Sequence, residues 1–109
     1  MKIINRLAAG GERPLVTRWT RYSNNDRLAL LVVDKDDPEY EFTASLNFPN
    51  HPIPDGAIAV KDYSENEGMV ETLVESGVIE PRPMFSIPSG FISAGVYRLT
   101  EAALEEAKS

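Results

Sequence analysis

Strand-like and turn-like stretches alternate over residues 15–48. The stretch "LVTRWTRYS", residues 15–23, is rich in β-branched and aromatic side chains, which are typical of strands. The nearly continuous apolar run "RLALLVVD", residues 27–34, indicates a second strand that is central in a sheet or buried on both faces. The polar stretches "NND" and "KDDPE" predict turns, because Asn and Asp bond to nearby backbone and proline interrupts pairing.

The third predicted strand has the clearest pattern. In "YEFTASLNF", residues 40–48, apolar and polar side chains alternate with a period of two. That period places five apolar side chains on one face of a strand, namely Tyr40, Phe42, Ala44, Leu46 and Phe48. Three strands joined by short turns predict an antiparallel meander.

A short strand, "AIAVKDY", is followed by one amphipathic helix. Four apolar residues recur at helical spacing, namely Met69, Val70, Leu73 and Val74. Gly77 stands where a C-terminal glycine cap belongs. Ser64 or Asn66 can cap the other end by accepting the first free backbone N–H bonds. We expect a helix of about three turns that lies across the apolar face of the sheet.

The last third of the chain predicts one more strand and a tail helix. "EPRPMFSIPSG" is a proline-rich connection with a brief extended edge at residues 84–87, and "FISAGVYRL" is the final strand. Thr100 can cap a short helix over "EAALEEAKS". The expected fold is therefore α+β: an antiparallel sheet of four to six strands with one main amphipathic helix packed on it. Residues 1–14, which include "AAGGERP", form a flexible N-terminal arm, and residues 15–109 form the domain.

Composition limits the classes of protein to consider. The 109 residues are 42% hydrophobic and 26% charged, as expected for one soluble domain. Without cysteine there is no disulfide, thiol nucleophile or thiolate metal site, which suits a reducing compartment. No apolar run is long enough to span a bilayer. The apolar run near the N-terminus is too short for a secretory signal. We expect no membrane association and a place in the cytoplasm.

The net charge of −6 is unevenly distributed. Residues 1–27 carry +4, whereas residues 28–109 carry −10. The acidic majority opposes nonspecific binding to nucleic acid, which depends on neutralising phosphates. If nucleic acid were bound at all, Arg18, Arg21 and Arg27 would make the contacts.

The acidic stretch before the helix has two interpretations. Asp62, Glu65 and Glu67 could hold Mg²⁺ or Ca²⁺. With a divalent ion, Asp62 and Glu65 could support hydrolysis. The same residue types at a helix start also satisfy free N–H groups and the helix dipole. We favour capping, because the alternating carboxylates of a calcium loop are absent. We therefore expect no catalytic residue, no metal and no cofactor.

Three further features are candidates for binding. His51 is the only histidine, and one histidine in a proline-rich loop is most simply a surface residue. Ser89 and Gly90 form a turn whose hydroxyl and N–H groups could contact an anion. A third candidate is a mixed aromatic and cationic interaction surface on the first strand, made of Arg18, Trp19, Arg21 and Tyr22. For Trp19 we favour core packing, with the arginines paired to the acidic half.

The second half of the chain resembles a known family. "FTASLNF", "AIAVKDYSENEGMVETLVESGVIEP" and "IPSGFISAGVYRL" are similar in order and spacing to small domains of unknown function from phages, plasmids and conjugative elements. The resemblance covers residues 40–99. The family pattern has three segments. Residues 43–47 match the first segment, and residues 60–66 stand at the second but depart from it. The third segment matches best, at Ser89, Gly90, Phe91 and Tyr97. The resemblance implies a small accessory protein of a phage or mobile element, but no particular activity.

These features predict a binding protein rather than an enzyme. We expect it to occupy a host or phage protein through a surface patch, with host defence or host metabolism as the affected process. The alternative is a small-molecule or nucleotide-binding module that uses "PSG" and the helix start as anion contacts. An exposed edge strand could also pair two copies into a homodimer.

Overall fold

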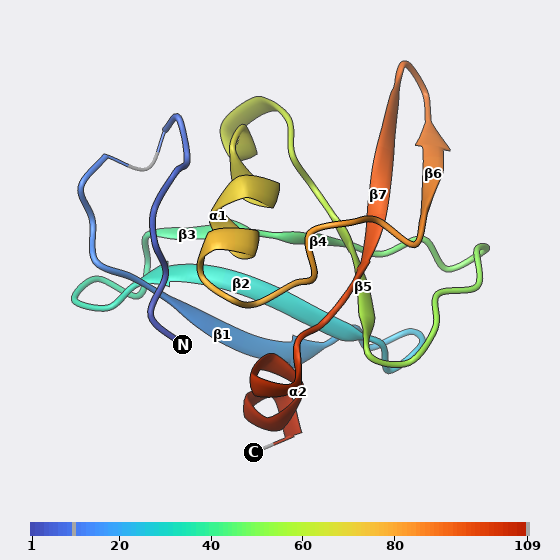
Figure 1. Ribbon diagram of the computed structural model, residues 1–109, viewed down its shortest axis with the longest axis horizontal. Helices are drawn as coiled ribbons and strands as arrows, with labels where there is room; N and C mark the ends of the chain where they lie inside the picture. Colours follow the sequence, from blue (N-terminus) through green and yellow to red (C-terminus); the bar gives the residue numbers. More distant parts are fainter. Residues whose placement is uncertain (10, 109) are drawn as a thin grey trace.

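The first two predicted strands form a hairpin in the computed structural model, which describes residues 1–9 and 11–108 (Figure 1). β1 (Leu15–Arg21) and β2 (Leu28–Asp34) run antiparallel, with Leu15 opposite Asp34. β3 (Glu41–Thr43) pairs with the other side of β2. β2 is therefore central in a three-stranded sheet, as its nearly continuous apolar run predicted.

The third predicted strand is divided between two sheets at Ala44. On one side of Ala44 lies β3, and on the other lies β4 (Ser45–Leu46), which pairs with β5 (Ala57–Val60). The Ala44 N–H donates to Leu30 of the first sheet, and its carbonyl accepts from Lys61, directly after β5. The prediction that all five alternating apolar residues share one face was therefore wrong. Tyr40, Phe42 and Ala44 join the main core, whereas Leu46 and Phe48 pack in a second cluster.

The second sheet has four strands in the order β4-β5-β7-β6. β6 (Phe85–Ser89) and β7 (Ile92–Arg98) form a hairpin that projects from the body of the protein (Figure 1). The extended edge expected at residues 84–87 is thus a full edge strand. Within the described residues the α+β class is confirmed, but its strands form two antiparallel sheets instead of one.

The main helix is shorter than three turns. It follows a 3-10 turn (Ser64–Asn66), and α1 itself spans Met69–Glu75. Gly77 ends it as predicted: with φ of +75° it donates its N–H to Val74, and the next N–H, of Val78, reaches Leu73. Met69 and Leu73 are fully buried against both sheets, so the amphipathic face is also as predicted.

The tail helix α2 spans Glu101–Lys108. Thr100 caps it as expected, because its Oγ1 accepts the N–H of Ala103 at 3.2 Å. Ala103 is fully buried in the main core. No helix in the described part of the chain has the length and apolarity needed to cross a bilayer.

The first eight residues pack on the domain, which differs from the expected flexible arm. Ile3 and Leu7 are buried in the main core. The N–H of Ile3 donates to Leu15, and the N–H of Ala8 donates to Glu67 beside α1. Ile3 and Leu7 therefore extend the main core beside β1 and α1. Residue 10 of the expected arm and residue 109 of the domain lie outside the described residues.

Candidate functional site

Asp62 caps helix α1. Its Oδ1 accepts the N–H of Gly68 at 2.8 Å and that of Met69 at 3.2 Å, and its Oδ2 accepts the N–H of Val70 at 3.4 Å. The predicted caps, Ser64 and Asn66, were wrong. They lie in the 3-10 turn, which folds back and brings Asp62 to the helix start. The N–H groups expected to contact an anion at the helix start therefore already have a carboxylate partner.

The other polar residues of this stretch have separate partners. Asn66 is buried, and its Nδ2 donates to the carbonyls of Thr43 at 2.7 Å and Lys61 at 3.3 Å. Glu65 accepts a hydrogen bond from the Lys61 ammonium, and this bond lowers the pKa of Glu65. Within the described residues, no three His, Asp or Glu side chains gather in a way that could hold a metal ion. The stretch joins α1 to β3 and β5.

The candidate surface on β1 is not one surface. Arg18 and Trp19 are neighbours on a strand, so their side chains point to opposite faces. Arg18 is exposed and pairs with Glu41 at 2.7 Å, whereas Trp19 is half-buried, packs against the main core and donates to Glu106. Arg21 donates to the carbonyl of Asp26 at 2.7 Å.

Tyr22, the fourth member of that candidate surface, also has a partner inside the fold. Its hydroxyl lies 2.9 Å from the Oγ of Ser45, at the crossing between the sheets. Burial raises the pKa of Tyr22 more than this hydrogen bond lowers it. A role in partner binding for these four residues stays a prediction.

The candidate anion contact lies at the tip of the β6–β7 hairpin. Ser89 is opposite Ile92, so Gly90 and Phe91 alone form the turn. Gly90 has φ of +65°, which suits the first central position of a type II′ turn. Ser89 and Gly90 are both exposed, and their contact with an anion stays a prediction.

Exposed apolar side chains gather on this hairpin. Phe91 is wholly exposed, at 109% of its reference area, while Phe85 is 40% and Met84 is 38% exposed. Among the described residues, Ile4 is the other large hydrophobic residue with this degree of exposure. We call Met84, Phe85, Pro88 and Phe91 the hairpin surface.

A groove adjoins the hairpin surface. It has a volume of about 530 Å³ and lies between β6 and the loop that joins β4 to β5. Its lining is mainly apolar: His51, Pro52, Ile53 and Pro54 on the loop side, and residues 85–88 on the strand side. His51 is an exposed loop residue, as expected, and its ring meets that of Phe48 edge to face.

A second cavity, of about 390 Å³, lies between the β1–β2 turn, the same loop and α2. Arg21, Arg27 and Lys108 line it together with Asp26 and Asp55. Arg27 donates to the carbonyls of Phe48 at 2.8 Å and His51 at 2.7 Å, so its guanidinium holds the loop in place. Of the candidate interaction residues, Arg21 lines this cavity.

Sequence reasoning missed the hairpin surface. The sequence predicts "EPRPMFSIPSG" as a connection with a brief extended edge at residues 84–87, and it places Phe91 at the start of the final strand. The available signal was Gly90 at the first position of a two-residue turn, which places the next residue at the tip of a hairpin. That signal predicts an exposed Phe91.

No protein-family model matches the chain, and neither do curated proteins or solved structures. The similarity to domains from phages and mobile elements therefore stays an expectation that rests on the three sequence segments alone.

Proposed function

We propose that this protein acts by binding another protein through the hairpin surface and its adjoining groove, and that it is not an enzyme. One observation carries the proposal: Phe91 is wholly exposed on the same hairpin as Phe85 and Met84, which are themselves well exposed. Alternation along β6 places Phe85 on the face of the buried Ile87 and Pro88 on the opposite face, so the hairpin offers apolar contacts on both faces as well as at its tip. Exposed apolar side chains grouped on one element of a small domain favour an interaction site there. Phenylalanine and methionine are among the residues enriched at protein interfaces.

The paired strands hold the backbone beneath these side chains. The register of the hairpin runs without interruption from the Phe85–Val96 pair to the Ser89–Ile92 pair, and Ile87 is buried beneath it. Burying an exposed phenylalanine side chain yields about 1.5–3 kcal/mol. Two phenylalanines and a methionine on a fixed hairpin can therefore supply a useful share of a binding free energy.

The resemblance to phage and mobile-element domains supports a setting for this activity. In that setting the target is a host or phage protein, and the consequence of binding falls on host defence or host metabolism. An edge strand gives a second copy of the chain as a further candidate partner, and β6 is such an edge.

The alternative function is binding of a small molecule, and the cavity beside Arg21 favours it. The cavity combines cationic side chains with apolar ones such as Ile53 and Leu104. Mass spectrometry of purified, denatured protein tests this alternative. Recovery of a stoichiometric ligand that Arg21→Ala abolishes would favour it over protein binding.

Capture from a cell extract tests the proposed function, with Phe91→Ser as the test variant. Ile4→Ser is the matched control, because Ile4 is 46% exposed but lies outside the hairpin. We expect wild type and Ile4→Ser to capture the same protein and Phe91→Ser to lose it. Equal capture by all three chains would contradict the proposal.

A further inference from the structure

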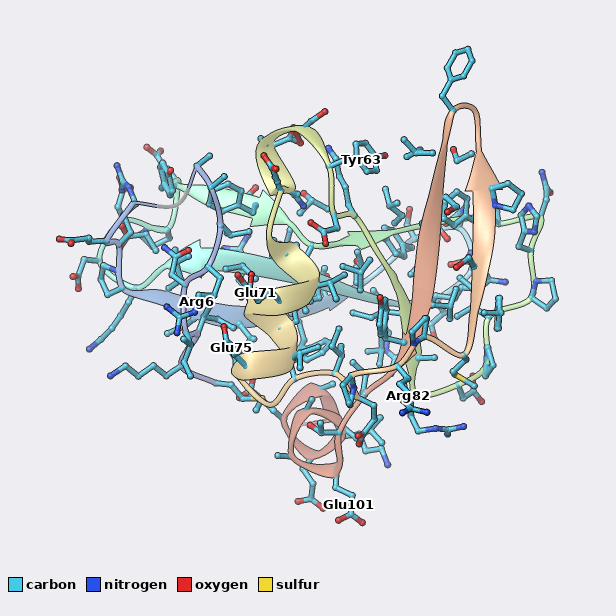
Figure 2. The ribbon with its side chains drawn as sticks, turned by 45° about the horizontal axis from the view of Figure 1, so that its top comes forward. Arg6, Tyr63, Glu71, Glu75, Arg82 and Glu101 are labelled. Atoms are coloured by element: carbon cyan, nitrogen blue, oxygen red, sulfur yellow. The ribbon has the colours of Figure 1, made fainter. Side chains whose placement is uncertain are left out.

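The hairpin segment differs in charge from the rest of the chain. Residues 81–98 contain two arginines, Arg82 and Arg98, and no acidic residue, although the whole chain carries 17 acidic residues and a net charge of −6. Neither arginine forms an ion pair within the described residues. Figure 2 shows Arg82 near the base of the hairpin. Two uncompensated cations thus accompany the hairpin surface.

Arg98 stands on the same face of the second sheet as the groove. Alternation along β7 places Arg98 on the side of Val96, which packs with Ile87 and Ala57 in the second cluster. Arg98 is directly opposite Ala57 in the register of β5 and β7. The groove is therefore apolar along β6, and the Arg98 guanidinium is available on the same face of the sheet.

The outer edge of β6 offers backbone groups to an extended chain. The two-residue turn makes the Ser89–Ile92 and Ile87–Ala94 pairs the hydrogen-bonded ones, so the N–H and C=O of Ser86 point away from β7. Pro88 also occupies an outward position, where its missing N–H removes no bond of the hairpin. A strand added beside β6 would gain bonds at Ser86 and at the Pro88 carbonyl.

We infer that the partner contributes a short extended segment that combines apolar side chains with carboxylates. This inference rests on the proposed function. The apolar side chains enter the groove beside Phe85 and Ile87, and the carboxylates pair with Arg82 and Arg98. Extended polyanions such as nucleic acid or an anionic bilayer fit less well, because a chain of net charge −6 is repelled by their whole surface.

Selection from a random 12-residue peptide library displayed on phage tests the inference. Wild-type protein is compared with the double charge reversal Arg82→Glu/Arg98→Glu. The control is Lys2→Glu/Lys35→Glu, which changes the net charge equally at exposed positions outside the hairpin. We expect peptides selected on wild type and control to be enriched in Asp and Glu between apolar residues. These peptides should bind the Arg82→Glu/Arg98→Glu variant roughly tenfold more weakly, since attraction becomes repulsion at two exposed pairs.

Other outcomes separate this inference from the proposed function. Selected peptides could lose binding to Phe91→Ser yet carry no excess of carboxylates. That result would overturn the inference of an acidic partner segment and leave the proposed binding at the hairpin surface intact. Peptides that bind Phe91→Ser as well as wild type, or a library that yields no binder, would count against both. Binding of wild type to phosphatidylglycerol vesicles, lost in Phe91→Ser, would identify a lipid surface as the occupant and overturn the inference.

Discussion

The indole Nε1 of Trp19 donates a hydrogen bond of 2.8 Å to Glu106, a residue 87 positions away in the chain. The Glu106 carboxylate also accepts bonds from Thr17 and from the amino group of Met1. This carboxylate thereby joins β1 to α2. Burial raises the pKa of Glu106, but the hydrogen bonds from the amino terminus, Thr17 and Trp19 together outweigh burial and lower the pKa below 4.5.

Acid should weaken this junction. A carboxyl whose pKa is lowered by folding contributes stability that is complete above its ordinary value and is lost as pH falls through the lowered value. We therefore predict that the free energy of unfolding of wild type declines more steeply below pH 4.5 than that of Glu106→Gln. Fluorescence of Trp19, the only tryptophan, reports the transition. Glu39→Gln, an exposed change in a turn, should follow wild type; identical pH profiles for all three would contradict the role of Glu106.

Asp62→Ala should destabilise the protein by about 1 kcal/mol, because it removes the side-chain acceptor for three backbone N–H groups. Glu67→Ala is the control. It removes an exposed carboxylate that takes no part in the cap, and it should change stability by no more than about 0.5 kcal/mol. Urea unfolding measures both. If millimolar Mg²⁺ or Ca²⁺ raised the urea midpoint of wild type but not of Asp62→Ala, the metal interpretation would replace the cap.

Gly68→Ala should destabilise more than Gly77→Ala. Both glycines have positive φ, +94° and +75°, so each alanine carries a left-handed penalty of about 1–2 kcal/mol. At position 68 the new Cβ would also lie 2.4 Å from the carbonyl oxygen of Arg6, whereas position 77 is open. Thermal unfolding of the two variants measures the difference. Equal losses would show that the first residues do not pack on the start of α1 in solution.

Ser45→Ala should cost about 1–3 kcal/mol, because the Ser45 Oγ accepts the buried N–H of Leu30 at 2.9 Å. Tyr22→Phe removes a second partner of the same hydroxyl but leaves the Leu30 bond intact, so its effect should be smaller. Chemical denaturation of both variants provides the comparison. A larger loss in Tyr22→Phe would mean that the sheet crossing at Ala44 depends on the tyrosine instead.

The sequence pattern predicted the strands and helix ends that are determined by residues close to them in the chain. The β1–β2 hairpin follows from two strand-like runs around "NND", and Gly77 and Thr100 mark helix ends through contacts within a few residues. The cap at Asp62 was missed because it acts across an intervening 3-10 turn that no propensity indicates. The break at Ala44 was missed because an alternating strand has the same pattern whether it stays in one sheet or passes to another.

The candidate site was less predictable than the fold. The sequence marked Trp19 and its neighbours as an interaction candidate because aromatic and cationic residues are enriched at interfaces. The favoured interpretation, core packing of Trp19 and pairing of the arginines with the acidic half, holds for two of these residues: Trp19 packs on the core and Arg18 pairs with Glu41. Conversely, Phe91 resembles any strand residue until its neighbour Gly90 is placed in a two-residue turn. Exposure is a property of the assembled hairpin, which a residue-by-residue pattern does not contain.

Amide chemical-shift mapping is the most direct test of protein binding at the hairpin surface. Labelled wild-type protein is titrated with a peptide selected from a random library, and the perturbed amides are located on the structure. Binding at the hairpin surface predicts that the largest changes fall in residues 84–92 and in the loop residues 51–54, and that Phe91→Ser abolishes them. Changes centred on Arg18–Tyr22 or on the cavity beside Arg21, with residues 84–92 unaffected, would contradict it.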